Sequence, residues 1–217
     1  GTIDSTFGAN GIITFEIRDD NYVRDMTFLE DECFITAGEY YIRNNTPYKP
    51  QLYFSKHNRN GSFDPVFGVN GLIDSLRDSS GSITKIKILS DGNILAMDCG
   101  LRSKLIKLDK DGLLYDSFGE NGIAESPNSI VFDVLQDGRI ITAGTYFDGT
   151  YGFFNLACYH ADGTTDLSFG NNGSIYYDVS GDRYEYVSEI KIPGGNKILV
   201  AGAAFNVGNG LQEKAIV

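Results

Sequence analysis

The chain has 217 residues, enough to bury about 70 % of its unfolded surface in one domain or two small ones. Its 29 Asp and Glu against 18 Lys and Arg give a net charge of -11, which repels phosphate backbones and argues against a nucleic-acid partner. Cys33, Cys99 and Cys158 form no C-x-x-C pair, and no apolar run reaches about 18–20 residues, so we expect neither a disulfide framework, a zinc knuckle nor a membrane span.

A two-part signature recurs along the whole chain. The motif F-G-x-N-G occurs four times, and the intervals between its phenylalanines are 60, 51 and 51 residues. Its phenylalanines are Phe7, Phe67, Phe118 and Phe169. A glycine stands six positions before each of them: Gly1, Gly61, Gly112 and Gly163. The second part is upstream, as CFITAG, NILAMD, RIITAG and KILVAG, so the chain is a tandem array of one unit.

Each unit is predicted to form four short strands and no helix. In residues 82–125 the strands are ITKIKIL, NILAMD, KLIKLD and GIAES, in that order. Asp91-Gly92 between the first two indicates a tight hairpin, for which we expect a type I′ turn. The F-G-x-N-G segment joins the third strand to the fourth, and its Phe is interpreted as an apolar plug that holds a structural loop on the sheet.

Tandem four-stranded units of this length are typical of an all-β fold, the β-propeller. The predicted blades span about residues 22–75, 82–125, 128–179 and 184–217 plus 1–17, in a single domain over residues 1–217. ITFEI near the N-terminus is expected to be the outer strand of the last blade and to close a four-bladed ring. The alternatives are half of an eight-bladed ring made by a homodimer, or a fragment of a longer array.

The string GTTDLSFGNNGSI, with DGRIITAGTY and FNLACYHADG before it, resembles the delta-sixty repeat of bacterial propeller-type proteins. The resemblance covers essentially the whole chain and implies a secreted, periplasmic or surface-attached protein. It supplies no catalytic residues. Departures from the pattern are Tyr115 in an Asp position, Asp98 in a small-residue position, and Asp31-Glu32 where other repeats have Asp-Gly or Gly-Gly.

The loops between strands two and three, and those between blades, vary in length and are rich in aromatic residues. Binding surfaces tend to lie on variable loops held by a rigid scaffold, and they are enriched in Tyr and Arg. We therefore predict a contact surface for protein or glycan; the alternative is that these rings merely cover loop ends. The predicted residues are Tyr40, Tyr41, Arg43, Tyr48, Tyr146, Phe147, Tyr151 and Tyr184.

The first strand of each unit alternates apolar and charged side chains. Met26, Ile86, Phe132 and Ile190 form one aligned apolar row, which is expected to pack between blades. The charged set is expected to reach an axial channel, where opposite signs pair; an axial anion or metal site is the alternative. Its members are Asp25, Lys85, Lys87, Asp133, Glu189 and Lys191.

No enzyme signature stands out. There is no G-x-S-x-G, P-loop or H-E-x-x-H motif, and the only histidines, His57 and His160, are both near the end of third strands. We therefore expect no cofactor and no metal. The sequence favours a non-catalytic binding or scaffold module over its alternative, a carbohydrate-active hydrolase or lyase with paired carboxylates on the variable-loop face or at the axis.

Overall fold

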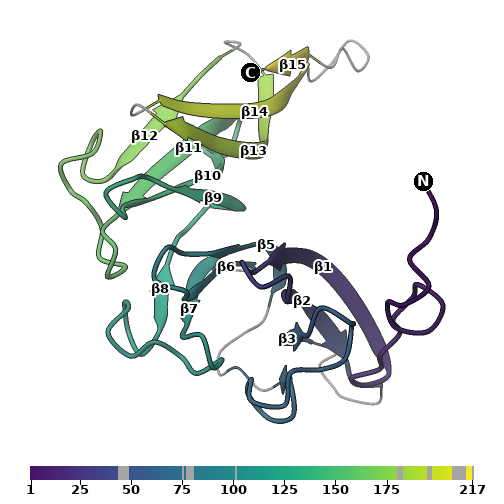
Figure 1. Cartoon of the computed structure of the whole chain (residues 1–217). Coiled ribbons are helices and arrows are strands. Elements are labelled where there is room, and N and C mark those ends of the chain that lie inside the picture. The colour runs from purple at the N-terminus through teal and green to yellow at the C-terminus, as the bar shows by residue number, and fades with distance from the viewer. Residues whose placement is uncertain are drawn as a thin grey trace. The chain divides into compact units, whose positions relative to one another are not determined.

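The computed structural model describes residues 1–43, 49–74, 76, 81–100, 102–179, 183–194, 197–206 and 214–216. Within these ranges the chain consists of β-strands and connecting loops, with no helix, which confirms the all-β prediction (Figure 1). It divides into two compact units, one of Gly1–Leu101 with Ile106–Tyr115 and one of Arg102–Leu105 with Asp116–Val217. No described helix could cross a membrane.

The strands follow the repeats of the sequence. Repeat one is an antiparallel sheet of β1 (Asp20–Phe28), β2 (Phe34–Tyr41), β3 (Pro50–His57) and β4 (Leu72–Ile73), in that order. Repeat two is a sheet in the order β5 (Ser82–Ile88), β6 (Ile94–Cys99), β7 (Lys104–Leu108) and β8 (Ile123–Glu125). These four strands agree with the four expected over residues 82–125.

The third sheet contains two repeats. Repeat three consists of β9 (Val131–Val134), β10 (Ile140–Phe147), β11 (Gly152–Tyr159) and β12 (Ser174–Tyr177). Repeat four consists of β13 (Arg183–Gly194), β14 (Lys197–Asn206) and β15 (Lys214–Ile216). One parallel bridge, Gly152 to Tyr184, links β11 to β13, whereas the other pairings are antiparallel. None of the described sheets closes on itself.

The expected outer strand ITFEI does not form in this structure. Residues 13–17 belong to no strand, and the Phe15 ring instead packs against repeat one, with its centroid 5.2 Å from the His57 ring and 5.6 Å from the Phe63 ring. Alternation in a sequence shows that a segment can be a strand, but a strand also needs a neighbour whose N–H and C=O groups pair with it. The pattern alone therefore did not decide the pairing of this segment.

The F-G-x-N-G motif forms a structural loop because three of its five positions require left-handed backbone. Asn10, Asn70, Asn121 and Asn172 have φ values of 56°, 55°, 52° and 50°. The motif's first glycine has φ between 53° and 58° in the four copies, and its last glycine between 87° and 91°. Gly and Asn are the residues that tolerate this region at the lowest cost. The phenylalanines Phe67 and Phe118 are fully buried, as a plug should be.

Each of the first three loops docks on a turn of the following repeat. The Gly8, Gly68 and Gly119 N–H groups donate to the carbonyls of Asn60, Asp111 and Asp162, at 3.0, 2.9 and 2.7 Å. A Cβ on the glycine after each acceptor would lie 3.0–3.3 Å from the ring of Phe7, Phe67 or Phe118. Gly61, Gly112 and Gly163, which stand six positions before the last three motif phenylalanines, are therefore needed for close packing, and the same contact recurs at three junctions.

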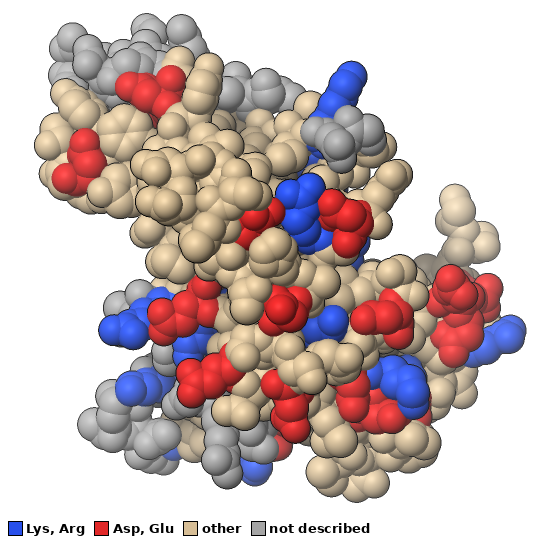
Figure 2. Space-filling model, turned by 90° about the vertical axis from the view of Figure 1, so that its left-hand side faces the viewer, with Lys and Arg blue, Asp and Glu red and all other residues tan. Residues whose placement is uncertain are grey.

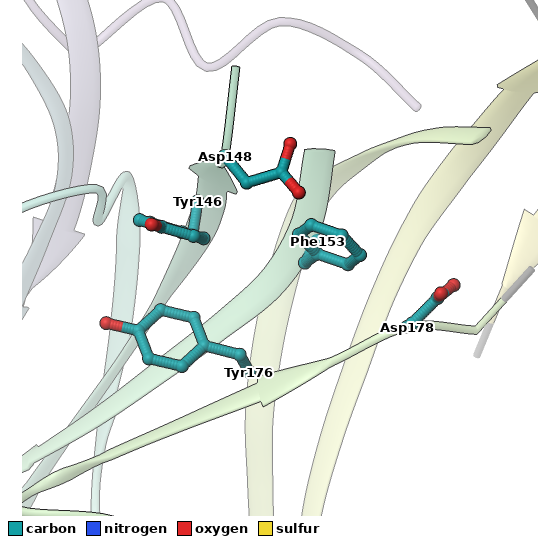
Figure 3. A pocket seen from close by; sticks show the side chains of 5 residues that line it. All are labelled: Tyr146, Asp148, Phe153, Tyr176 and Asp178. Carbon is teal, nitrogen blue, oxygen red and sulfur yellow. The ribbon is translucent and has the colours of Figure 1, made fainter. Parts of the chain in front are cut away.

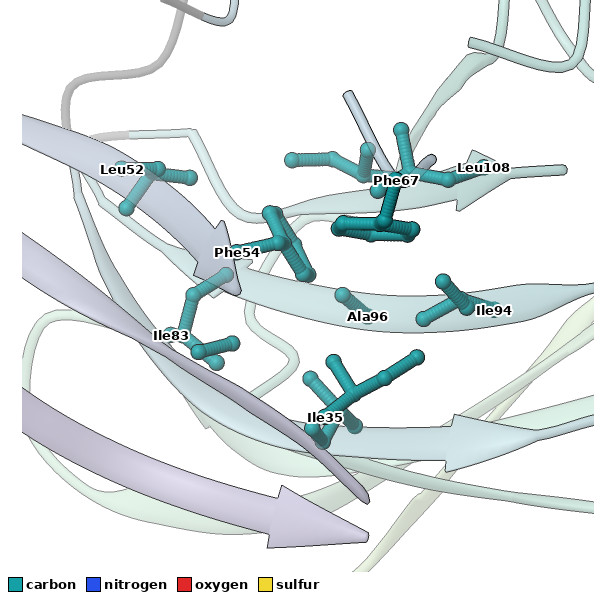
Figure 4. Packing of buried hydrophobic residues seen from close by; sticks show 11 residues of the cluster. Ile35, Leu52, Phe54, Phe67, Ile83, Ile94, Ala96 and Leu108 are labelled. Atoms are coloured by element: carbon teal, nitrogen blue, oxygen red, sulfur yellow. The ribbon is translucent and has the colours of Figure 1, made fainter. Parts of the chain in front are cut away.

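Apolar side chains fill the junctions between repeats. In Figure 4, Ile35, Phe54 and Phe67 of repeat one pack with Ile83 and Ile94 of repeat two. Burying one side chain of this size contributes about 1.5–3 kcal/mol. A second cluster joins repeats three and four through Ile141, Ala143, Phe154, Val187 and Ile190. The first-strand residues Ile86 and Ile190 belong to these two clusters, as their row predicted, and Phe132 of the same row is fully buried.

Two carboxylates of the predicted axial set join neighbouring first strands through the backbone. Asp25 Oδ2 accepts a hydrogen bond from the Ile86 N–H, and Asp133 Oδ2 accepts one from the Ile192 N–H, each at 2.7 Å. Their Oδ1 atoms accept from the N–H of the next residue in their own strand. A carboxylate bound in this way provides an acceptor for backbone N–H groups at the edge of a strand.

The other members of the axial set lie on β5 and β13. Lys85 and Lys87 are half-buried on β5. Glu189 Oε1 accepts from the Ile190 N–H, and its Oε2 lies 3.9 Å from Lys191 Nζ. The axial channel itself stays a prediction.

The hairpins form where Asp-Gly predicted them, but the turn type was wrong. Type I′ needs positive φ at both central residues, whereas at Asp91-Gly92 only Gly92, at 80°, is positive. The Gly92 N–H donates to the Leu89 carbonyl and the Leu89 N–H to the Asn93 carbonyl, which is the pattern of a type I turn followed by a bulge. In repeat one Glu32 takes this position at 64°, a strained φ for a residue with a side chain.

Asp98, the departure from the small-residue position, is compensated on the adjacent strand. In repeats one, three and four a glycine stands there (Gly38, Gly144 and Gly202), and a Cβ would lie only 1.8–2.1 Å from a carbonyl oxygen of the neighbouring chain segment. In repeat two the glycine is on the other side, at Gly81, where a Cβ would lie 2.1 Å from Asp98 Oδ1. Every repeat thus has one glycine at this close approach of two chain segments, but in repeat two the glycine lies on the opposite segment.

Candidate functional site

One face of repeat three gathers aromatic side chains near the loop between β10 and β11. Tyr146 pairs with Phe153 across the hairpin, and Asn155 pairs with Tyr176 on β12. Directly paired residues share a face, and so do residues two apart on one strand. Tyr146, Phe153 and Tyr176 therefore point to the same side of the sheet, as Figure 3 shows.

These three rings and two carboxylates line an open hollow of about 450 Å³. Its lining residues are Tyr146, Asp148, Phe153, Tyr176 and Asp178. The Tyr146 and Tyr176 rings lie against each other at a centroid distance of 4.7 Å, and the Asp148 carboxylate extends toward Phe153 (Figure 3). Asp178 follows β12 on the same chain segment as Tyr176. The site thus combines ring faces with hydrogen-bond acceptors, which is the usual composition of a small-ligand site.

The β10–β11 loop holds Asp148 as an anion. Its Oδ1 accepts hydrogen bonds from the Thr150 N–H at 2.7 Å and the Tyr151 N–H at 2.8 Å. These bonds, first from Tyr151 and then from Thr150, lower the pKa of the Asp148 carboxyl below its ordinary value. Asp148 therefore carries a full negative charge at neutral pH.

Of the predicted contact residues in repeats three and four, only Tyr146 lines the hollow. Phe147 stacks on Tyr184 beside it, with centroids 5.5 Å apart and the planes inclined by 16°. Tyr151 contributes its backbone N–H to Asp148. The structure thus brings the four predicted residues of this region together around the β10–β11 hairpin, although only one of them lines the hollow.

The predicted contact residues of repeat one are engaged within their own sheet. Tyr40 is buried and its hydroxyl donates to the Asp74 carbonyl at 2.6 Å. Tyr41 meets the Tyr22 ring edge to face, at 6.0 Å. The Arg43 guanidinium lies 2.7 Å from Asp20 Oδ1. Tyr48 lies outside the described residues.

Sequence reasoning missed four of the five residues of the hollow: Asp148, Phe153, Tyr176 and Asp178. The sequence did contain a signal for Phe153. A hairpin that joins Tyr146-Phe147 to the string YGFF at residues 151–154 places one aromatic residue opposite another once the register is known. Tyr176 and Asp178 required the pairing of β12 with β11, which follows a 14-residue connection and could not be counted from a turn.

A second hollow, of about 810 Å³, lies on repeat one and is mainly apolar. Its walls include Phe7, Met26, Phe28, Phe34 and Arg59. Met26 is 55 % exposed, whereas its counterparts Ile86, Phe132 and Ile190 in the other repeats are at most 5 % exposed. Phe28 is 63 % exposed, whereas its counterparts Ile88, Val134 and Ile192 are half-buried. This face of β1 therefore lacks the covering that the equivalent strands have.

The remaining reactive side chains have structural surroundings. His57 is buried between the Phe34 and Phe63 rings, at 4.8 and 4.9 Å, and burial lowers its pKa. Burial, and then the charge of Asp166, raise the pKa of the Cys158 thiol to about 11, which suppresses the reactive thiolate. Across the described ranges no three His, Cys, Asp or Glu residues are placed to hold a metal.

The acidic excess does not form one continuous patch on the face shown in Figure 2, where basic side chains lie beside acidic ones. Several are paired: Arg18 with Asp74 at 3.4 Å, and Arg139 with Asp137 and Asp166 at 2.9 and 3.1 Å. The pairs of Arg18 with Asp74 and of Arg139 with Asp137 are exposed and add little stability, whereas Asp166 is buried. These ion pairs neutralise part of the negative charge locally. The carboxylates of the hollow are therefore a local feature rather than part of a broad acidic surface.

Comparison with known proteins agrees with the repeat architecture. Residues 135–169, from the residue after β9 to the phenylalanine that begins the fourth F-G-x-N-G motif, match a family model described as a domain of unknown function (DUF5122) beta-propeller. No curated protein matches the chain. The match includes the β10–β11 hairpin that carries Tyr146, Asp148 and Phe153, and it supports a β-propeller type of repeat for this chain.

Proposed function

We propose that the chain is a non-catalytic binding module that recognises a glycan through the hollow of repeat three. The observation that carries this proposal is the union of three ring faces with two carboxylates, Asp148 and Asp178, in one open hollow. Rings pack on the apolar faces of sugars, and carboxylates accept hydrogen bonds from hydroxyl groups. A protein ligand is the alternative within this proposal.

A glycan array tests the proposal with variants of the hollow. We expect wild type to bind a subset of glycans and the Tyr146→Ala/Tyr176→Ala double variant to lose that binding. The matched control is Phe147→Ala, which removes a neighbouring ring, half exposed, that does not line the hollow. Equal glycan binding by wild type and the double variant would exclude this hollow as the site.

A carbohydrate-active hydrolase or lyase is the second candidate, because two carboxylates line the same hollow. Glycosidases need one carboxyl with a raised pKa as general acid, whereas the pKa of Asp148 is lowered. Asp148 would thus serve as base or nucleophile rather than as the general acid. Release of reducing sugar from a bound glycan, abolished in Asp178→Asn, would favour this candidate over the binding module.

We further propose that the module is a closed four-bladed propeller of the delta-sixty type, from a secreted or surface-associated bacterial protein, in which the N-terminal segment completes repeat four. Its support is that repeat one and repeat four each have an uncovered apolar face. Met26 and Phe28 are exposed on repeat one, and Leu199 is 48 % exposed on repeat four although its counterparts Ile35, Leu95 and Ile141 are at most 1 % exposed. The alternative is a dimeric eight-bladed ring.

Methionine oxidation and mass in solution test the closure. Met97 is fully buried and serves as the internal control for Met26. We expect peroxide to leave both methionines unmodified in a monomer. Protection of Met26 in a dimer would favour the eight-bladed ring, and rapid oxidation of Met26 alone would contradict both forms of closure.

A further inference from the structure

Three of the four motif phenylalanines lie against a glycine of the following unit. In each case the glycine stands six positions before the next motif phenylalanine, and a Cβ on it would lie 3.0–3.3 Å from the ring. The order along the chain is therefore constant, because the ring of one unit meets the glycine of the next. The three contacts are Phe7 with Gly61, Phe67 with Gly112 and Phe118 with Gly163.

One phenylalanine and one glycine of this series take no part in the three contacts. Phe169 begins the last motif, and Gly1 stands six positions before Phe7. Phe169 is half-buried, whereas Phe67 and Phe118 are only 1 % exposed. Among the described residues, no atom lies within 4 Å of the position of a Cβ on Gly1. Gly1 and Phe169 belong to different compact units, so each has the position of a contact residue in its own repeat.

The segment before Phe7 folds like the corresponding segments of repeats one and three. The Asp4 carbonyl accepts the N–H three positions later at 3.3 Å, and Asp4 Oδ1 accepts the N–H two positions later at 2.9 Å. The same two bonds measure 3.2 and 3.1 Å at Asp64, and 3.1 and 3.0 Å at Asp166. Gly1, three residues before Asp4, therefore has the place in its unit that the ring-contacting glycines have in theirs.

The residues after Phe7 are also seated on repeat one as in a complete unit. The isoleucine two residues after the last glycine of the motif lies against the glycine of the next unit: a Cβ on Gly61 would meet Ile13, and a Cβ on Gly112 would meet Ile73. A complete unit has three strands before this loop. Repeat four, with β13, β14 and β15, provides the three strands that the N-terminal segment needs.

We infer that Gly1 packs against the ring of Phe169 of the same chain. This inference rests on the proposed closed propeller and adds to it the residues that meet where repeat three receives the N-terminal segment. The pair completes the series, because every motif phenylalanine then lies against the glycine of the unit that follows it. A residue without a side chain is needed there, since even a Cβ would crowd the ring at the three described contacts.

Nuclear Overhauser effects (NOEs) between glycine α-hydrogens and phenylalanine ring hydrogens, measured in an otherwise deuterated chain, test the inference. We expect each of the three described contacts to give an NOE, and Gly1 and Phe169 to give a fourth of similar intensity. Phe169→Leu should remove the fourth NOE alone. The matched control is Phe118→Leu, which should remove the NOE of Gly163 and leave that of Gly1.

A mixture of two samples, one with visible glycines and the other with visible phenylalanines, separates contacts within a chain from contacts between chains. An NOE between Gly1 and Phe169 in this mixture would assign the contact to a dimer and overturn the inference. Absence of the NOE while peroxide leaves Met26 unmodified would also overturn it, but the closed propeller would stand. Rapid oxidation of Met26 without the NOE would contradict both proposals.

Discussion

Tyr40 and Tyr146 occupy the same position in repeats one and three, two residues after the glycine that ends CFITAG and RIITAG. Tyr40 is 4 % exposed and its hydroxyl is bonded to the Asp74 carbonyl, so it is part of the core. Tyr146 is half-buried and lines the open hollow. One position in the repeat therefore supports either a structural ring or a ring available to a ligand.

The difference follows from the residue at the end of the fourth strand. Asp74 stands three positions after the last glycine of its F-G-x-N-G loop, and Tyr176 stands at the same place in repeat three. In repeat one the backbone of this residue receives the Tyr40 hydroxyl, and its carboxylate pairs with Arg18. In repeat three its ring packs against Tyr146. The neighbour on another strand decides the role of the tyrosine.

Replacing each tyrosine by alanine should give the largest difference in stability between the two repeats. We expect Tyr40→Ala to lower the free energy of unfolding by about 3–5 kcal/mol, because it empties a filled core position. Tyr146→Ala should cost less than about 1 kcal/mol and affect only ligand binding. Urea titrations of both variants measure the contrast, and equal losses of stability would refute it.

Repeat one also has a buried acid where repeat three has Thr145. Glu39 is fully buried and is hydrogen-bonded to Arg24 and to the Ser82 hydroxyl. Arg24→Ala should cost about 2 kcal/mol, less than a fully buried pair because Arg24 is partly exposed. The control is Arg43→Ala, which removes an exposed pair and should change stability by less than about 0.5 kcal/mol. Similar values for the two variants would show that the Glu39 network is not structural.

Removing only the tyrosine hydroxyl groups should give a smaller difference in stability in the same direction. Tyr40→Phe leaves the Asp74 carbonyl without its donor and is expected to cost about 1 kcal/mol. Tyr146→Phe should leave the free energy of unfolding unchanged. Thermal or urea unfolding of the pair distinguishes them, and a loss in Tyr146→Phe as large as in Tyr40→Phe would remove the distinction.

The smallest expected contrast concerns acid stability. The Ser168 hydroxyl, and then the Arg139 guanidinium, lower the pKa of Asp166 to about 2, while Lys56, at 2.9 Å, lowers the pKa of its counterpart Asp64. Because these folded-state values lie below the ordinary 3.8, the stability they provide is present above about pH 4 and is lost as the pH falls toward 2.

We therefore expect Arg139→Ala to raise the pKa of Asp166, together with that of its other partner Asp137, and to leave the pKa of Asp64 unchanged. Lys56→Ala should raise the pKa of Asp64 and leave that of Asp166 unchanged. NMR titration of the carboxyl carbons measures both values in one experiment, and circular dichroism should show acid unfolding at a higher pH in each variant. Unchanged carboxyl titrations would mean that neither ion pair acts on its acid.

Turns and loops could be predicted from the sequence, whereas contacts between strands that are distant in the sequence could not. Gly92 and the glycines and asparagine of each F-G-x-N-G loop identified turns, because few residues tolerate positive φ. Tyr40 was assigned to a surface because its burial depends on Asp74, 34 residues away. The carboxylates of the hollow were missed for the same reason, since Asp178 joins Asp148 only through the β11–β12 register.

The docking of each F-G loop on the next turn has an evolutionary consequence. Because this contact uses a Phe ring, a glycine and a backbone carbonyl, units that keep these features share one loop-to-turn contact whatever their other loops carry. Gene duplication or recombination can thus exchange a whole unit, with its ligand-facing hairpin, and keep this contact at the junction. New specificities could arise in such arrays by shuffling units rather than by accumulating point mutations within one.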